Sequence, residues 1–313
     1  MILVICQLSS SIQSIYARRT KQRLLYLSKY QHRMEAFLDF FETMPSWQKL
    51  LWVFTCLSFN WIIEAISPLF RFGYKKVKHV GVNMFFLASD LALNLLFTLA
   101  TVGIYAWATT NSFGLLYLID LPIWLELIIA VMVLDLVAQY AVHYLLHKVP
   151  WMWRFHMIHH SDTHVDATTG TRHHPGDYIT REVFALAAIL VTGIPLAYYL
   201  FYRICTIFFA YFTHANISLP KVLDKTLSYV FVTPDMHKFH HHFERPWTDT
   251  NFGNIFSFWD RIFGTMVYDD PKQVKFGLDV LDDSKDENIG YQLMVPFSKE
   301  VKTDPEKGFW GFG

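Results

Sequence analysis

The sequence has little cysteine and little charge for its length of 313 residues. Its three cysteines are far apart and show no CxxC spacing, so the sequence predicts neither disulfide bonds nor a thiolate metal site. We expect Cys6, Cys56 and Cys205 to be small buried apolar residues. Basic and acidic residues are equally numerous, at 27 each, so the charge of the whole chain favours neither nucleic acid nor an acidic partner.

Several sequence motifs are also missing. No glycine-rich phosphate loop occurs, and neither does a flavin or nicotinamide fingerprint. The chain therefore offers no recognisable nucleotide site of its own. No HExxH sequence occurs either, which removes the main support for a zincin-like protease.

Apolar residues dominate the chain instead. Hydrophobic residues make up 53% of it and aromatic residues 17%, more than a soluble chain usually carries, so we predict an all-α helical bundle integral to a membrane. Crossing a bilayer takes about 20 helical residues, and the apolar stretches that matter on this scale are 50–70, 80–108, 123–142 and 183–212. The fourth carries Gly193 and Pro195 near its centre, where we expect a broken or re-entrant hairpin.

Loop charge predicts the orientation, because Lys and Arg collect in cytoplasmic loops. The loop 109–122 has no basic residue, whereas the loop after the first stretch holds Arg71, Lys75, Lys76 and Lys78. The basic loop after the first stretch is therefore predicted inside, and the loop 109–122 is predicted outside. The third apolar stretch then returns to the cytoplasm and brings His143 and His147 to its inner end.

The N-terminal residues conflict with this orientation. Residues 1–33 hold six Lys or Arg, yet they lie outside if the first stretch crosses the membrane. Two explanations stay open: the first stretch lies in the membrane without crossing, or the chain starts at Met34. The apolar run at 1–6 is too short for a signal peptide and the charges follow it, so we do not expect cleavage.

The most informative feature is the distribution of histidine. Thirteen of the fifteen histidines lie between His143 and His242. Residues three and four apart share a helical face, so an HxxxH motif offers two imidazoles to one point and an HxxHH motif offers three. The motifs contain His143 and His147; His156, His159 and His160; and His237, His240 and His241.

Local signals place these motifs on helices. Pro150 follows the third apolar stretch and suits the first turn of a new helix that carries the second motif. Thr233 is a suitable N-cap for the third motif, with Pro234 at the first helical position and Asp235 in the first turn. On that helix His242 would point elsewhere.

Polar residues also precede the first motif. Asp135 and Gln139 stand at four-residue steps before His143, on a helix that is otherwise apolar. Polar groups at membrane depth are costly and usually functional. We therefore expect Asp135 to accept a hydrogen bond that fixes an imidazole tautomer. The isolated His32 and His79 are expected at the surface or at an interface, and His164, His173 and His242 are expected to be bystanders.

The number of ligands indicates two metal ions. One catalytic zinc needs about three protein ligands, so eight histidines oversupply a single ion, and His214 and His174 add to the excess. Imidazole suits zinc, copper, iron and nickel alike. A neutral ligand set in a lipid-facing setting is most typical of an oxygen-activating di-iron centre. His214 can join the second motif only if the fourth stretch turns back, since a straight crossing would separate them by about 30 Å.

These segments resemble the fatty acid hydroxylase and sterol desaturase superfamily of membrane-bound non-haem di-iron oxygenases, and especially its bacterial sterol-desaturase-like and alkylglycerol-monooxygenase-like branch. The likeness covers residues 123–270 and rests on HYLLHKVPWMWRFHMIHHSD, TRHHPGD, FTHANI, TPDMHKFHHHFERP and DTNFGNIFSFWDRIFGTM. It implies as metal ligands His143, His147, His156, His159, His160, His214, His237, His240 and His241. Candidates for further ligands, or for partners that support the ligands, are Asp135, His174, Asp177, Asn251 and Asp260.

The resemblance implies that two iron ions activate O2 to hydroxylate or desaturate a C–H bond of a membrane lipid, such as a sterol, a fatty acyl chain or an ether lipid. The site would lie on the cytoplasmic face. Electrons would come from a separate donor, either a reductase with a ferredoxin or a b5-type protein, or a pterin. We expect three parts: an N-terminal extension at 1–49, the membrane-embedded catalytic domain at 50–270 and a C-terminal tail at 271–313.

Two alternatives from other classes stay open. A His-rich metal transporter would line its histidines along a membrane span rather than collect them on one side. A di-zinc membrane hydrolase would need an open ligand position and a general-base carboxylate, for which the sequence offers Glu182 or Glu244.

Overall fold

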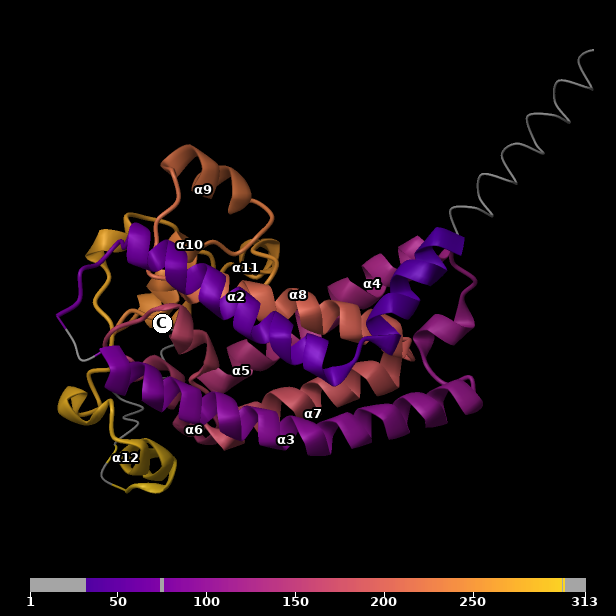
Figure 1. The fold of residues 1–313 in the computed structure, drawn as a ribbon, viewed down its shortest axis with the longest axis horizontal. Helices are drawn as coiled ribbons and strands as arrows, with labels where there is room; N and C mark the ends of the chain where they lie inside the picture. The colour runs from indigo at the N-terminus through magenta and orange to yellow at the C-terminus, as the bar shows by residue number, and fades with distance from the viewer. Residues whose placement is uncertain (1–31, 74–75, 300, 302–313) are drawn as a thin grey trace, which may run out of the picture.

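The computed structural model describes residues 32–73, 76–299 and 301, so the expectations for Cys6 and for residues 1–31 concern a part outside the described residues. Long helices run along the longest axis of the molecule, and short helices gather at one end (Figure 1). Within the described residues, helices are the only regular elements apart from one bridge between Phe231 and Phe256. The predicted all-α fold is confirmed.

Four helical segments of the described chain are long and apolar enough to cross a membrane: Ser46–Ile66, Lys76–Leu118, Ile123–Lys148 and Leu196–His214. The first, α2 (Ser46–Ile66), ends earlier than the predicted 50–70. Pro68 explains the early end, because proline lacks an amide hydrogen and disfavours the helical conformation of the residue before it. The second segment begins with α3 (Lys76–Thr110), which packs along α7 (Pro175–Thr192).

The third crossing helix contains a π-helical interruption. It consists of α4 (Ile123–Asp135), the π segment Leu136–Ala141 and α5 (Val142–Lys148), which follow one another without a break. A π turn accommodates an extra residue, which rotates the side chains beyond it by about 100° relative to a continuous α-helix. Asp135 and His143 nevertheless stand eight residues apart, about 12 Å along the helix axis, and this distance separates the two side chains.

The predicted hairpin at Gly193 and Pro195 is confirmed. Helix α7 ends at Thr192, Gly193 adopts a left-handed φ of 69°, and Pro195 precedes α8 (Leu196–His214). The first limb differs from the prediction because it begins at Pro175 rather than at 183. This limb carries charged residues in its first turns, and it is not among the four segments that are apolar enough to cross.

The turns divide between the two ends of the bundle as the loop charges predict. After α2, the Leu69 amide donates to the carbonyl oxygen of Asn216 at 2.9 Å, directly beyond the end of α8 that carries His214. At the opposite end, a Cβ added to Gly114 would lie 2.3 Å from the nitrogen of Gly193. The basic loop and the histidine motifs therefore share one end, and the loop 109–122 lies at the other.

Short helices cover the end that carries the histidines (Figure 1). They are α6 (Pro150–His160), α9 (Lys221–Leu227), α10 (Pro234–His240), α11 (Phe258–Ile262) and α12 (Ile289–Met294). The segment 271–299 packs on α6, where the Arg154 guanidinium donates to the carbonyl oxygens of Pro296, Val301 and Ser298. The helix at 32–43 packs at the bundle, with the ring of Phe41 5.1 Å from that of Phe201 on α8. The predicted boundaries at 49 and 270 stay predictions.

Replacing Gly193 by alanine should destabilise the bundle. A left-handed φ costs an L-residue roughly 1–2 kcal/mol, and a Cβ at Gly193 would also lie 2.6 Å from the carbonyl oxygen of Phe113. Thermal unfolding in detergent, followed by circular dichroism, should show a midpoint several degrees below that of the parent protein. The matched control is Gly103→Ala in α3, where an added Cβ meets nothing within 4 Å. The control midpoint should stay the same or rise, and an unchanged midpoint for Gly193→Ala would contradict this account of the turn.

Candidate metal centre

The structure brings the nine histidines of the sequence analysis together in two adjacent groups. Within each group, the ligand atoms lie within 4.8 Å of one another, and every one of these residues is buried. The first group contains His143, His147, His156, His160 and His240. The second group contains His159, His214, His237 and His241.

Each HxxHH motif is divided between the two groups, which corrects the expectation that its three imidazoles meet at one point. In α6, His156 and His160 face the first group and His159 faces the second. Residues three and four positions along a helix lie on opposite sides of the starting residue, about 100° apart. In the third motif His237 and His241 face the second group while His240 faces the first, so both motifs serve both groups.

Backbone carbonyls orient two rings of the first group. The Nδ1 atom of His143 lies 2.8 Å from the carbonyl oxygen of Phe252, and that of His240 lies 2.7 Å from the carbonyl oxygen of Thr250. A carbonyl oxygen only accepts, so Nδ1 must carry the proton in both rings. In a neutral imidazole the other nitrogen, Nε2, then presents a lone pair to the interior of the group.

Carboxylates orient two more rings of this group. Asp177 accepts from Nδ1 of His156 at 2.8 Å, and its other oxygen accepts from Nε of Arg181 at 2.9 Å. Asp249 accepts from Nδ1 of His147 at 3.2 Å and from the amine of Lys148 at 2.6 Å. Burial alone would raise the pKa of Asp249, but the contacts with His147 and Lys148 outweigh it and lower this pKa to about 2. Asp249 is therefore ionised and can only accept.

The first group thus has inward lone pairs, and those of His143, His147 and His240 meet no hydrogen-bond donor of the protein. The Nε2 atoms of His143 and His156 lie 3.0 Å apart although both are acceptors. The Nε2 atoms of His147 and His240 are buried without a hydrogen-bond partner. Lone pairs at this distance repel one another, and a cation between them would turn the repulsion into coordination. The donor set fits a transition metal that binds imidazole.

The second group has the same character. Nδ1 of His214 lies 2.6 Å from the carbonyl oxygen of Ala210, so its Nε2 is an acceptor, and it lies 3.0 Å from Nε2 of His159 and 3.1 Å from Nε2 of His237. The single lone pair on the Nε2 of His214 can accept one N–H group, and it cannot accept from both His159 and His237. Both ring nitrogens of His241 are buried without a partner. This group therefore also fits a cation.

Burial keeps the histidines of the short helices neutral. It is the main cause that lowers the pKa of each ring, and neighbouring imidazoles lower it further, in His156, His159, His160, His237, His240 and His241. A neutral imidazole is the form that donates to a metal. The lowered pKa values therefore keep the ligand set ready at neutral pH.

Asn251 and Asp260 support the loop that orients the imidazole rings. The Asp260 carboxylate accepts from the amides of Phe252 at 2.7 Å and Gly253 at 3.0 Å. The Asn251 side chain donates to the carbonyl oxygens of Met236 and Val267, at 2.8 Å each. These bonds fix the loop whose carbonyl groups, at residues 250 and 252, orient His240 and His143.

Two other expectations are corrected. Asp135 does not contact a histidine of either group. It lies about 12 Å along the helix axis from His143. It accepts instead from the Tyr202 hydroxyl at 2.9 Å and the Trp259 indole at 3.0 Å, and so joins α4, α8 and α11. His174 lies outside both groups and caps α7, where its Nδ1 accepts from the amide of Gly176 at 3.0 Å. Its other nitrogen lies 3.3 Å from the carbonyl oxygen of Leu293.

Sequence reasoning missed three residues that contact the histidine groups or support the loop beside them. Asp249 carried no motif signal apart from its place at the start of the DTNFGN segment. His173, expected to be a bystander, stacks on His159 with ring centroids 4.7 Å apart, and its Nδ1 lies 3.8 Å from Asp90. His79, expected at a surface or interface, is buried and lies 3.2 Å from Asp162. By contrast His242 points away as expected, and its Nδ1 accepts from the amide of Lys275.

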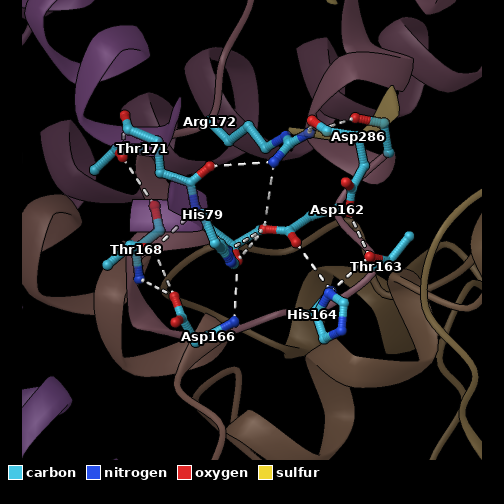
Figure 2. A network of polar contacts seen from close by, with 12 residues as sticks. His79, Asp162, Thr163, His164, Asp166, Thr168, Thr171, Arg172 and Asp286 are labelled. Carbon is cyan, nitrogen blue, oxygen red and sulfur yellow. Dashed lines mark hydrogen bonds and ion pairs between the residues drawn. The ribbon is translucent and has the colours of Figure 1, made fainter. Parts of the chain in front are cut away.

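A buried polar network supports the loop between α6 and α7 (Figure 2). Asp162 accepts from the Thr169 hydroxyl at 2.7 Å and lies beside both His79 and Arg172, which also donates to the carbonyl oxygen of Asp286. This loop packs directly on α8, since a Cβ added to Gly170 would lie 2.6 Å from the carbonyl oxygen of Ala210. The network therefore holds the loop in contact with the turn of α8 that carries His214.

Glu64 of α2 joins the same loop to the segment after α8. Its Oε1 accepts from the amide of Ala167 at 2.6 Å and from the amide of Asn216 at 2.5 Å. Asn216 follows His214 closely in sequence, and Ala167 belongs to the loop that packs on the turn of α8 holding His214. The first crossing helix thus fixes the position of the second histidine group, a role that the apolar pattern of residues 50–70 did not indicate.

Comparison with known proteins agrees with this geometry. Residues 127–265 match the family model described as fatty acid hydroxylase. An ornithine lipid hydroxylase from Rhizobium tropici is 29% identical over 40% of this chain and 37% of its own length. A cholesterol 25-hydroxylase-like protein from Danio rerio is 27% identical over 68% of this chain and 86% of its own length.

The human alkylglycerol monooxygenase is 28% identical over 57% of this chain and 38% of its own length. The chain thus spans little more than a third of this relative and of the ornithine lipid hydroxylase. No solved structure matches. The resemblance to the fatty acid hydroxylase and sterol desaturase superfamily is therefore confirmed, with residues 127–265 as the segment that matches the family.

Proposed function

We propose that this protein is a di-iron enzyme that uses O2 to hydroxylate a C–H bond of a membrane lipid. The observation that carries the proposal is the pair of buried imidazole groups with inward lone pairs, at one end of a bundle with four segments apolar enough to cross a membrane. The named relatives support a lipid hydroxylation, since they are called hydroxylases or monooxygenases of lipids.

The first iron would be held by the group of His143 and the second by the group of His214. Together, the two ferrous ions would supply the reduction of O2 and the removal of a hydrogen from an unactivated carbon. One oxygen atom would enter the C–H bond and the other would leave as water. Neither a flavin nor a nicotinamide site is evident in the sequence, so a separate reductase with a ferredoxin or b5-type protein, or a pterin, would supply the electrons.

The surrounding residues would keep the imidazoles in the tautomer that coordinates. Asp177 and Asp249 hold the Nδ1 protons of His156 and His147, and backbone carbonyls do the same for His143 and His240. The Trp153 and Phe252 rings pack against His147 with centroids 4.8 Å and 5.1 Å away, and so help to exclude water. Exclusion of water prevents the loss of reactive species to side reactions.

The substrate would be a lipid that reaches the site from the bilayer. The relatives' names point to an ornithine lipid, a sterol and an alkylglycerol, which share an aliphatic chain or ring rather than a headgroup. The basic loop beside the histidines supports a site on the cytoplasmic face.

Two observations weigh against the alternatives. Glu182, proposed as the general base of a di-zinc hydrolase, is bound to Arg203 at 2.8 Å instead of facing the histidines, and Glu244 is exposed. A metal transporter would distribute its ligands along a crossing, whereas these nine histidines collect at one end of the bundle.

Metal analysis tests the proposal directly. Protein purified without oxygen should contain about two irons per chain, because each imidazole group offers enough ligands for one ion. Elemental analysis by mass spectrometry measures the content, and oxygen consumption with added lipid, a reductase and NADPH measures the activity. Zinc alone, with no activity after reconstitution with ferrous iron, would sink the oxygenase proposal.

Replacing His214 by alanine should remove about one metal ion per chain. This change deletes the lone pair that faces both His159 and His237, while the first group keeps all its members. The metal content of the purified variant should therefore fall by about half, since one of two sites is lost. His242→Ala is the control, because His242 points to Lys275, and its metal content should match the parent. Full retention of metal in His214→Ala would show that His214 is not a ligand.

Replacing Asp177 by asparagine should weaken metal binding without removing a ligand. The amide loses the charge that stabilises the Nδ1–H of His156, and such changes beside a ligand cost roughly 10–100-fold in metal affinity. Competition with a chelator, followed by iron analysis, measures the affinity. The control is Asp283→Asn, at an exposed position. Equal affinities for the two variants, with unchanged thermal midpoints, would contradict the role of Asp177.

A further inference from the structure

Two short helices outside the crossing segments form a lobe at the end that carries the histidines. The lobe consists of residues 221–231, which include α9, and residues 255–263, which include α11. Its two parts are joined where Ser257 donates to the carbonyl oxygen of Val230 at 3.0 Å, and the adjoining Val232 donates to that of Ile255 at 2.9 Å. We call this unit the α9–α11 lobe.

The lobe exposes large apolar side chains to its surroundings. Val222 is 82% exposed and Ile262 is 64% exposed, and the other exposed apolar side chains of the lobe are Leu223, Tyr229, Val230 and Phe263. A patch of this kind marks a contact with a membrane or a protein. None of these residues takes part in the histidine groups.

The depth of the lobe favours the membrane. The Phe263 ring stacks on Tyr140 at 5.1 Å, and Tyr140 lies within the crossing segment Ile123–Lys148. That segment has 26 residues and is about 39 Å long, about 9 Å more than the hydrocarbon core. Tyr140 lies about 12 Å from the end at Lys148. If all of the extra 9 Å or so projects from the membrane at the Lys148 end, Tyr140 still lies below that level. The Tyr140 backbone and the adjoining Phe263 are therefore level with the hydrocarbon core.

The charges of the lobe favour an anionic surface. Its exposed charged residues are Lys221, Lys225 and Arg261, whereas its acids, Asp224 and Asp260, are buried. The Arg261 guanidinium lies 4.9 Å from the centre of the Tyr229 ring, a pairing of cation and aromatic ring that suits the level of the lipid headgroups. The first exposed acids after the lobe, Asp269 and Asp270, follow Tyr268 outside it.

We propose that the α9–α11 lobe inserts its apolar side chains into the bilayer beside the crossing helices, and that Lys221, Lys225 and Arg261 bind anionic lipid headgroups. The lipid-facing surface of the bundle therefore extends beyond the four crossing segments onto the domain that carries the histidines. This inference rests on the membrane-spanning helices and not on the identity of the metal or the reaction.

The insertion has a direct connection to the candidate metal centre. Helix α11 presents Ile262 outward, while Asp260 on the same helix accepts from the amides of Phe252 and Gly253. The carbonyl group of Phe252 orients His143. The membrane surface, through one short helix, thus supports the loop that holds a ring of the first group.

Accessibility measurements with spin labels test the insertion. Single cysteines at Val222 and Ile262, in a full-length background with Cys6, Cys56 and Cys205 changed to serine, carry a nitroxide label. The protein is placed in nanodiscs of phosphatidylcholine and phosphatidylglycerol. Labels at Leu99, exposed on α3, and at Ser284, exposed outside the lobe, mark lipid and water. Dissolved O2 concentrates in lipid, and a nickel chelate stays in water.

The labels at Val222 and Ile262 should resemble Leu99, with frequent collisions with O2 and few with the chelate. Frequent collisions with the chelate, as at Ser284, would overturn the proposal. Few collisions with both agents would also overturn it, because they would indicate a protein contact such as a second copy of the chain.

The headgroup contacts are tested by charge reversal. With the label at Ile262, changing Lys221 and Lys225 to glutamate should raise the collision rate with the chelate several-fold in nanodiscs that contain phosphatidylglycerol, because anionic lipid would then repel the lobe. The effect should be smaller in phosphatidylcholine alone. Lys272→Glu, at an exposed position outside the lobe, is the control and should leave the rate unchanged. Equal rates in the charge-reversed and parent proteins would overturn the part of the proposal that concerns headgroups.

Discussion

The close approach of unprotonated imidazole nitrogens is the interaction on which the rest of this structure depends. Nitrogen lone pairs 3.0 Å apart, as between His143 and His156, repel one another unless a cation lies between them. The protein directs these lone pairs inward by giving the outer nitrogens fixed acceptors, which are carbonyl oxygens or carboxylates. Those acceptors in turn belong to segments held by Asp260, Arg181 and the buried network around Asp162. Much of the polar structure near this end of the bundle serves to fix the orientation of the rings.

The membrane helices contribute the framework for this arrangement. The hairpin at Gly193 returns the chain to the end from which it started, so His214 meets His159 across 55 residues of sequence. The buried carboxylate of Glu64 on α2 binds both the loop before α7 and the segment after α8. A buried polar side chain is costly at the edge of a membrane, and this one has two backbone amides as hydrogen-bond partners. Apolar packing alone would position the helices less sharply than these bonds do.

The sequence was sufficient to predict the class of fold, the hairpin and the nine histidines that meet, because each depends on local rules. Apolar length predicts a crossing helix, the Gly193 and Pro195 pair predicts a turn, and HxxxH spacing predicts a shared face. The failures arose where a local rule meets a distant contact. Asp135 and His143 are separated by two four-residue steps, about 12 Å along the helix, and Asp135 meets Tyr202 and Trp259 instead. Asp249 and His79 acquire their partners only through folding, from residues more than 80 positions away in sequence. No periodicity in the chain records such contacts.

The division of each HxxHH motif has a mechanical consequence. Adjacent residues face different groups: His159 and His160 on α6, and His240 at the end of α10 with His241 directly after it. The geometry of two helices, rather than of loops, therefore sets the distance between the two groups. A rotation of either helix about its axis would move two residues of one group and one residue of the other. A displacement of either helix therefore acts on both histidine groups at once, so a change at one group reaches the other through a single short helix.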